Sequence, residues 1–216
     1  MDIKIPYTPR KHQAFLHNKI SKNRWSVLVC HRRFGKTVCM INHLIRSALL
    51  SKQKNPRYAY ISPTFKQSKS IAWDYMKQFT AKIPYTKFNE TELRVDLPNG
   101  ARITLLGAEN SDGLRGIYLD GCVIDEYANV HSKLFPEIIR PALSDRKGYC
   151  VFIGTPQGMN NNFYELYQHA QGADDWFNYI AKASDTQIVD PEELVKAKEV
   201  MGDKKYQQEF ECDWIA

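Results

Sequence analysis

No run of about 18 apolar residues occurs in this sequence of 216 residues, so no membrane-spanning helix is predicted. The first residues, Met1 to Pro6, also lack the long apolar core of a secretory signal. The five cysteines stand singly and form no Cys-x-x-Cys pair, which argues against a zinc site or a disulfide framework. Internal repeats and low-complexity tracts are missing as well. These absences predict a protein that works in the reducing compartment where it is made.

The composition that remains is that of an ordinary globular protein, with 43% hydrophobic and 25% charged residues. The chain has 30 Lys and Arg against 24 Asp and Glu, a net charge of +6. This excess permits a polyanionic partner such as DNA or RNA, but many solvated basic proteins share it, and the basic residues here are dispersed. Charge alone therefore does not select a function.

Short apolar strands alternate with helix-patterned segments along most of the chain. Strands are expected over 25–30, 57–62, 121–124 and 149–153, an extended aromatic stretch over 176–180, and helices over 8–20, 36–51, 65–82, 132–143, 161–171, 191–201 and 203–210. The first helix is expected to begin with Thr8 as its N-cap and Pro9 at its first position. Residues 86–107 change to a period of two around a Pro98-Asn99-Gly100 turn, which predicts a β-hairpin. This pattern predicts an α/β fold, a mostly parallel sheet with helices on both faces and an added hairpin.

The strongest local signal is the segment from Trp25 to Val38, in which a valine-rich strand runs through a loop into a helix. This is the setting of a phosphate-binding P-loop, where backbone N–H groups and the helix dipole face an anion. Gly35 lets the backbone approach a phosphate closely. Lys36 supplies a charge to the β- and γ-phosphates of ATP, and the Thr37 hydroxyl is a candidate ligand for Mg²⁺.

The remainder of the loop is basic and departs from the usual pattern at one position. Arg32 and Arg33 lie inside the loop, and arginine is the residue that stabilises charge developing on the γ-phosphate oxygens. Arg33 and Phe34 also complete the predicted nucleotide-binding segment. Cys30 stands where the pattern normally has a glycine. The competing interpretation is a basic strand-to-helix turn that holds no ligand.

A second signal is the segment Gly121 to Glu126, a buried strand that ends in two carboxylates, as in a Walker B motif. Ligands bind where the strands of a parallel sheet end. Asp125 is expected to hold Mg²⁺, directly or through water, and Glu126 to orient and deprotonate the attacking water. An Asp-Glu pair that caps the next helix is the alternative, but the P-loop upstream favours the catalytic interpretation.

Three further residues are weaker candidates. Thr155, in the Gly154–Gly158 turn, should lie beside the strand that ends in Asp125, so its hydroxyl could sense the γ-phosphate. Gln13 lies on the first helix, and its amide can pair with both donor and acceptor on an adenine edge. Arg115 lies in a polar loop ten residues before Asp125 and is a candidate arginine finger acting on a neighbouring subunit.

Taken together, these residues resemble a known family. The matching segments are Gln13, 32–37, 114–116, 123–126, 154–158 and 206–214. They are similar to the ATPase domain of the large terminase subunit of tailed bacteriophages, which packages double-stranded DNA into procapsids. The resemblance covers nearly the whole chain in the right order. That family also tolerates loss of the first P-loop glycine, which accounts for Cys30.

The resemblance implies a RecA-like, additional-strand P-loop ATPase that uses ATP and Mg²⁺. It implies that Gln13 recognises adenine, that Arg32 acts in cis, that Arg115 is a trans-acting finger and that Thr155 belongs to the coupling motif. Arg33 occupies a place often held by glutamine, so which arginine of the loop acts stays open.

The resemblance also implies the partners: double-stranded DNA, a portal protein and a small terminase subunit. A homo-oligomeric ring is expected when the motor works, and a monomer in isolation is compatible with it. The location implied is the host cytoplasm, with no membrane partner. Residues 1–175 are expected to form the P-loop ATPase core, and residues 176–216 a C-terminal linker or lid leading to a nuclease domain that this sequence does not contain.

Two other functions remain compatible with the sequence. One is half of a RecA-like helicase or remodelling ATPase, which would separate strands and usually has a second such domain. The other is a nucleotide-binding DNA clamp without turnover, in which Asp125 and Glu126 are structural.

Overall fold

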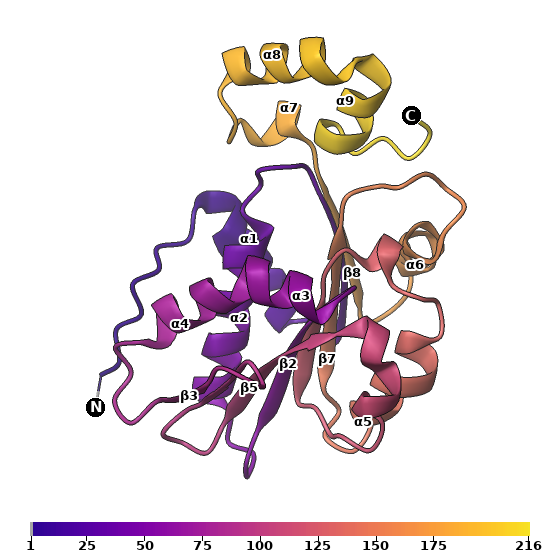
Figure 1. Ribbon diagram of the computed structural model, residues 1–216. Helices are drawn as coiled ribbons and strands as arrows, with labels where there is room; N and C mark the ends of the chain where they lie inside the picture. The colour runs from indigo at the N-terminus through magenta and orange to yellow at the C-terminus, as the bar shows by residue number, and fades with distance from the viewer. Residues whose placement is uncertain (1) are drawn as a thin grey trace.

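Eight strands form one sheet within residues 2–216, which are the residues that the computed structural model describes (Figure 1). The strands are β1 (Trp25–Cys30), β2 (Arg57–Ser62), β3 (Lys87–Asn89), β4 (Arg94–Asp96), β5 (Arg102–Gly107), β6 (Gly121–Ile124), β7 (Tyr149–Gly154) and β8 (Trp176–Ala181). Their order across the sheet is β3-β4-β5-β2-β6-β7-β1-β8. Every neighbouring pair from β5 to β8 is parallel, whereas β3, β4 and β5 pair antiparallel. The expected α/β class and the hairpin are confirmed.

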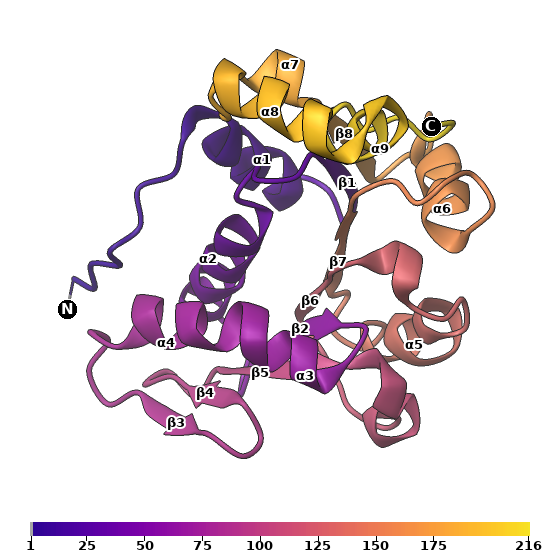
Figure 2. The same ribbon diagram turned by 45° about the horizontal axis from the view of Figure 1, so that its top comes forward.

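Helices cover both faces of the sheet (Figure 2). In the described residues they are α1 (Lys11–Ser21), α2 (Lys36–Leu50), α3 (Phe65–Ser68), α4 (Asp74–Thr80), α5 (Arg140–Ala142), α6 (Asn162–Ala170), α7 (Ala183–Thr186), α8 (Pro191–Met201) and α9 (Asp203–Phe210). α1, α2 and α4 pack on one face and α5 and α6 on the other. Successive β1 side chains alternate between the two cores: Leu28 and Cys30 face α2, whereas Val27 and Val29 face the opposite side.

Three local expectations need correction. The first helix begins at Lys11 with Arg10 as its N-cap, not at Thr8 and Pro9, because the Gln13 side chain accepts a hydrogen bond from the Arg10 N–H (2.9 Å) and closes the first turn there. The helix expected over 65–82 is interrupted by a π-helical turn between α3 and α4. The helix expected over 132–143 likewise begins with a π-helical turn at Leu134 before α5.

The C-terminal residues form a small cap over the carboxyl ends of the strands (Figure 1). α7, α8 and α9 pack around a cluster of their own, which includes Ala183, Tyr206 and Phe210. The strand β8 does not belong to this cap, because it pairs with β1 along its whole length. The sheet therefore continues past the boundary expected at residue 176, and the helical cap begins at Ala183. None of the helices in residues 2–216 is long and apolar enough to cross a membrane.

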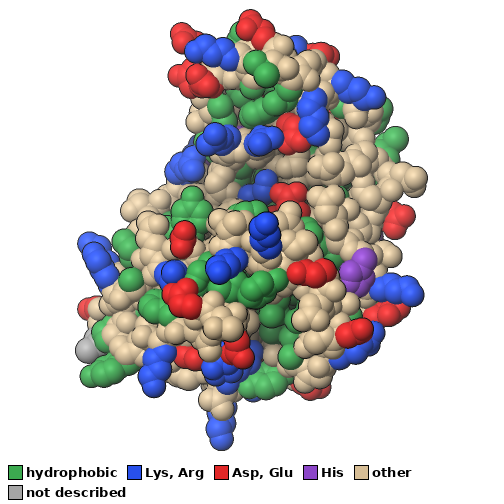
Figure 3. Space-filling view, viewed as in Figure 1, with side chains coloured by type: hydrophobic (Ala, Val, Ile, Leu, Met, Phe, Trp, Pro, Cys, Tyr) green, Lys and Arg blue, Asp and Glu red, His purple; other side chains and the backbone are tan. Residues whose placement is uncertain are grey.

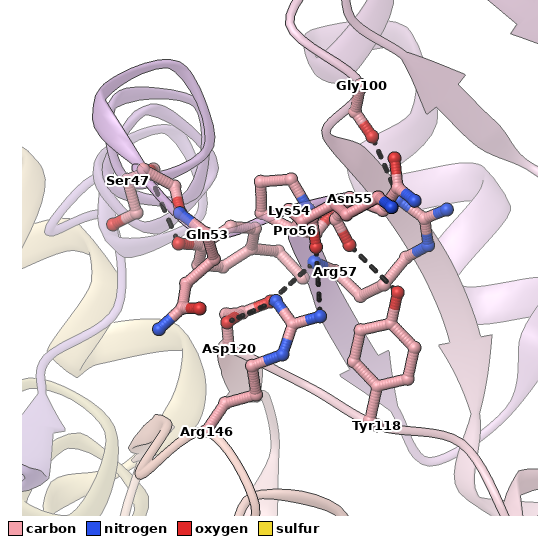
Figure 4. Close-up of polar contacts among 12 residues, drawn as sticks. Ser47, Gln53, Lys54, Asn55, Pro56, Arg57, Gly100, Tyr118, Asp120 and Arg146 are labelled. Carbon is pink, nitrogen blue, oxygen red and sulfur yellow. Dashed lines mark hydrogen bonds and ion pairs between the residues drawn. The ribbon is translucent and has the colours of Figure 1, made fainter.

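One buried carboxylate, Asp120, which directly precedes β6, joins the amino ends of β2 and β6 (Figure 4). Its Oδ2 accepts the backbone N–H of Arg57 at 2.8 Å, and the Arg146 guanidinium lies 3.4 Å from its Oδ1. Arg146 also donates to the Lys54 carbonyl at 2.9 Å. This network fixes β2 and β6 side by side and so sets the positions of their opposite ends.

Candidate nucleotide-binding site

The P-loop connects the buried strand β1 to the first turn of α2. Gly35 is the N-cap of α2 and has φ of +87°, a left-handed conformation that favours glycine. A Cβ at this position would lie 2.7 Å from the Arg10 guanidinium and 3.1 Å from the Gln13 amide nitrogen. The backbone conformation therefore favours glycine here, whereas the Arg10 side chain end would have to move aside for a larger residue. Arg33 also has positive φ, +69°. Cys30, in contrast, is a fully buried strand residue.

Two carboxyl groups, one buried and one half-buried, follow β6 at the same edge of the sheet. Asp125 is 3% exposed; its Oδ1 accepts the backbone N–H of Glu126 at 2.8 Å, and its Oδ2 accepts a hydrogen bond from the Tyr60 hydroxyl. Burial raises the pKa of Asp125 above the ordinary range, while the Lys36 ammonium and the Tyr60 hydrogen bond oppose the rise. The arrangement brings the P-loop lysine and the strand-end aspartate to one place.

Glu126 lies next to this pair in a left-handed backbone conformation, with φ of +49°. Burial raises its pKa, the Asp125 carboxylate adds to the rise, and Lys36 opposes it. Arg32 and Glu209 also act on it, with opposite signs. A carboxyl group with a raised pKa beside a cation is suited to accept a proton near neutral pH. The strained backbone is of the kind that occurs at functional sites.

The cap helix α9 contacts the P-loop through Arg32. The backbone N–H of Arg32 donates to the Glu209 carbonyl at 2.8 Å, and its guanidinium lies 4.0 Å from the Glu209 carboxylate. The neighbouring Gln208 donates to the Pro156 carbonyl at 2.6 Å. One turn of α9 therefore joins the P-loop to the turn after β7. Figure 3 shows the hollow between cap and body, with basic and acidic side chains inside it.

A second contact between cap and P-loop passes through a buried histidine. The His31 ring is fully buried; its Nδ1 hydrogen bonds with the Arg32 carbonyl and its Nε2 with the Thr186 hydroxyl, both at 2.7 Å. Thr186 ends α7, so the loop conformation depends directly on where the cap sits. Burial lowers the pKa of His31, which favours the neutral ring.

Two other candidates, Gln13 and Phe34, are buried and contact other parts of the protein. The Gln13 amide is 3% exposed: it caps α1, as described above, and donates to the Gly35 carbonyl at 3.2 Å, so it braces the P-loop. The Phe34 side chain is buried against His31, and its backbone N–H already donates to the His31 carbonyl. Phe34 thus shapes the loop from within the core.

Thr155 and Arg115 lie in different settings. Thr155 is buried, and its hydroxyl donates to the Cys30 carbonyl at 3.4 Å, so it joins the turn after β7 to the start of the P-loop. Arg115 is not brought to the P-loop. Its neighbour Leu114 packs in the core on the opposite face of the sheet from α2, and its exposed guanidinium lies 3.5 Å from Asp112. Within the described chain, Arg115 therefore makes no cis contact with the site.

Sequence reasoning missed three residues at this site: Tyr60, Glu209 and His31. Tyr60 and Glu209 are far in sequence from the motifs that they touch, and nothing in the chain pattern pairs them. His31 did carry a signal, since it stands inside the P-loop, but a histidine there has no fixed role.

A family model described as "Terminase large subunit, T4likevirus-type, N-terminal" matches residues 29–216. The chain belongs to this family. Large terminase subunits of Thermus phage G20c and Thermus virus P23-45 are each 26% identical to it in an alignment 182 residues long, and the match covers 76% of this chain and 36% of theirs. The chain therefore spans little more than a third of the length of these relatives.

Solved structures share the fold. The large terminase ATPase domain of Thermus phage P74-26 matches with a TM-score of 0.80 and 21% identity, covering 98% of this chain and 96% of that one. The large terminase of another thermophilic bacteriophage, in complex with ADP, matches with a TM-score of 0.79 and 16% identity, over 95% of this chain and 53% of that one. A complex of that same terminase with ATP-gamma-S matches equally well, with a TM-score of 0.79. The resemblance found in the sequence is confirmed for family and fold.

Proposed function

We propose that this chain is the ATP-hydrolysing motor domain of a viral large terminase and drives double-stranded DNA into a procapsid in the host cytoplasm. The observation that carries the proposal is the meeting of Lys36, Asp125 and Glu126 at the carboxyl edge of the sheet, with the pKa of both carboxyl groups raised by burial. Buried carboxylates beside a P-loop lysine suit phosphoryl transfer from ATP to water.

The residues at this edge also fit a magnesium ion. Asp125 forms no ion pair within residues 2–216. The Thr37 hydroxyl lies close to the Tyr60 hydroxyl that donates to Asp125. A carboxylate and a hydroxyl, with phosphate oxygens from the nucleotide, are the oxygen ligands that Mg²⁺ prefers. Thr37 and Asp125 would hold the ion, which when bound neutralises phosphate charge.

The other residues take roles around that centre. The N–H groups that begin α2 and the Lys36 ammonium would bind the phosphates, and Glu126 would take the proton of the attacking water. Arg32 is the candidate that would stabilise the γ-phosphate of the nucleotide in cis, with Arg33 beside it in the loop. Thr155 would couple the γ-phosphate to the conformation of the turn after β7, in which it lies. Gln13 would meet adenine only with the free part of its amide.

Oligomeric assembly completes the proposal. The exposed Arg115 pairs with Asp112 and with no P-loop residue of its own chain, so it would act on a nucleotide bound to a neighbouring subunit of a ring. A portal protein and a small terminase subunit are the further partners proposed. Residues 183–216 would act as the lid that leads toward a nuclease domain.

The ATPase rate per subunit, measured against protein concentration with and without duplex DNA, tests this function. A composite site predicts a rate per subunit that rises steeply with concentration and rises further with DNA. No ATP turnover at any concentration, or turnover indifferent to DNA, would contradict the proposed motor.

A further inference from the structure

The end of strand β2 carries two hydroxyl groups at the metal-binding edge that no motif accounts for. Tyr60 is fully buried, and its hydroxyl donates to Asp125 Oδ2. The Thr37 hydroxyl lies close to the same Tyr60 hydroxyl. One phenol group therefore lies beside both of the side chains that are proposed to hold Mg²⁺.

Ser62 lies two residues farther along β2 and so on the same face as Tyr60. Asp125 continues the ladder beside β2, because its N–H donates to the Ile61 carbonyl at 2.8 Å. Ser62 therefore stands next to Asp125 across the two strands. Its side chain is 1% exposed, and its hydroxyl has no hydrogen-bond partner within residues 2–216. A buried hydroxyl without a partner is costly, and its position beside Asp125 makes the proposed hydrated ion a candidate partner.

We propose that Tyr60 and Ser62 form an outer wall of the Mg²⁺ site, Tyr60 as the positioning residue for Asp125 and Ser62 as a hydrogen-bond partner for the hydrated ion. Tyr60 is the donor in its hydrogen bond with Asp125. It fixes one Asp125 oxygen while the Glu126 N–H fixes the other. Groups that hold a metal ligand in this way govern metal affinity. This inference rests on the proposed function.

The strand itself supplies a matched control. Tyr58 lies two residues before Tyr60, faces the same core and is also buried, but its hydroxyl donates to the Ser47 carbonyl at 3.3 Å, away from Asp125. Tyr58→Phe and Tyr60→Phe remove the same atom from the same strand. Only the second removes it from the metal-binding edge.

The test is the affinity of the whole chain for a fluorescent ATP analogue at increasing Mg²⁺ concentration. Tyr60→Phe is expected to raise the half-saturating Mg²⁺ concentration about tenfold, with unchanged affinity in EDTA, whereas Tyr58→Phe leaves both unchanged. An unchanged Mg²⁺ requirement in Tyr60→Phe would overturn the inference alone. Nucleotide binding by the unaltered chain that ignores Mg²⁺ would overturn the proposed metal site and this inference with it.

Ser62→Ala keeps the inference testable if Tyr60→Phe fails to fold. Removal of an unpartnered hydroxyl should leave the thermal stability of the ligand-free chain equal or higher. The same variant should raise the half-saturating Mg²⁺ concentration about threefold, the loss expected of one weak hydrogen bond. Loss of stability without a change in Mg²⁺ requirement would mean that Ser62 serves packing only, and would remove it from the wall.

Discussion

Two buried aspartates lie at opposite ends of β6, and they differ in the groups that contact their carboxylates. Asp120, at the amino end, is held by the Arg146 guanidinium and the Arg57 N–H, and Arg146 is itself anchored to a carbonyl (Figure 4). Asp125, at the carboxyl end, has no arginine partner in residues 2–216; a tyrosine hydroxyl and the next backbone N–H are its partners. The first network is complete, whereas the second leaves a buried carboxyl group without an ion pair among the described residues.

The difference shows in the energetics. Burial raises the pKa of Asp125 and of Glu126, so in the ligand-free protein both carboxyl groups favour the protonated form more than they would in an unfolded chain. A raised pKa in the folded state means that stability is lost as the pH rises through that pKa. The carboxyl end of the sheet therefore gives up stability at neutral pH, which fits the cation site and the proton acceptor proposed there.

Replacing each aspartate by asparagine should give the largest difference between the two ends of β6. Asp125→Asn should lower ATP turnover by about a hundredfold or more, while the ligand-free chain melts at the same or a higher temperature at pH 7. Asp120→Asn should do the reverse, with nucleotide binding kept and about 2 kcal/mol of stability lost with a charged hydrogen bond. Calorimetry and turnover assays on both variants decide. Equal destabilisation by the two changes would refute the distinction.

Lys36→Ala should abolish detectable nucleotide binding and keep the fold. Lys36 is the cation that acts on both carboxyl groups, and no other basic residue replaces it in the pKa balance of Asp125. Lys133→Ala, an exposed lysine before the π-helical turn, is the control and should bind as the unaltered chain does. The measurements are a titration with a fluorescent nucleotide and a melting curve that checks the fold. Nucleotide binding by folded Lys36→Ala would contradict the prediction.

Arg115→Ala should lower the ATPase rate at high protein concentration and leave nucleotide affinity unchanged. Mixing Arg115→Ala with Glu126→Gln should restore part of the activity, because each variant supplies what the other lacks at a shared site. The double variant mixed with Arg115→Ala is the control and should give no rescue. Absence of rescue in the first mixture would argue against a trans role.

The smallest expected effect concerns pH. Glu126 must be ionised to accept a proton, so the rate should fall as the pH drops through its raised pKa, above the ordinary value of 4.5. Glu209 contributes to that raised pKa, so Glu209→Gln should move the acid limb to lower pH. Glu199→Gln, on exposed α8, should not move it. An acid limb that Glu209→Gln leaves unmoved would show that the two carboxylates do not interact, and one shifted upward would show that Glu209 lowers the pKa of Glu126.

The fold and the motif residues were predictable because local patterns encode them. Buried valine-rich strands, the Gly35 turn and the strand that ends in Asp125 are each a few residues long, and parallel topology follows from their alternation with helices. The place of β8 in the sheet was not predictable from its pattern, because an edge strand of mixed exposure resembles an extended linker.

Contacts made across the fold were equally hidden. Nothing in the sequence pairs Tyr60 with Asp125, Glu209 with Arg32 or His31 with Thr186, since each pair is joined only by sheet register or by the cap. The sequence predicts that the Gln13 amide pairs with adenine. In the structure this amide caps α1 and donates a hydrogen bond to the Gly35 carbonyl. Its meeting with adenine stays a prediction.

The central claim is that Glu126 takes the proton of the water that attacks ATP. The direct measurement is ATP turnover by Glu126→Gln at a protein concentration where the unaltered chain is fully active, with nucleotide affinity measured on the same sample. Turnover by Glu126→Gln should be lower by at least about a hundredfold, with affinity within about threefold of the unaltered chain. Turnover that is unchanged while nucleotide stays bound would contradict it.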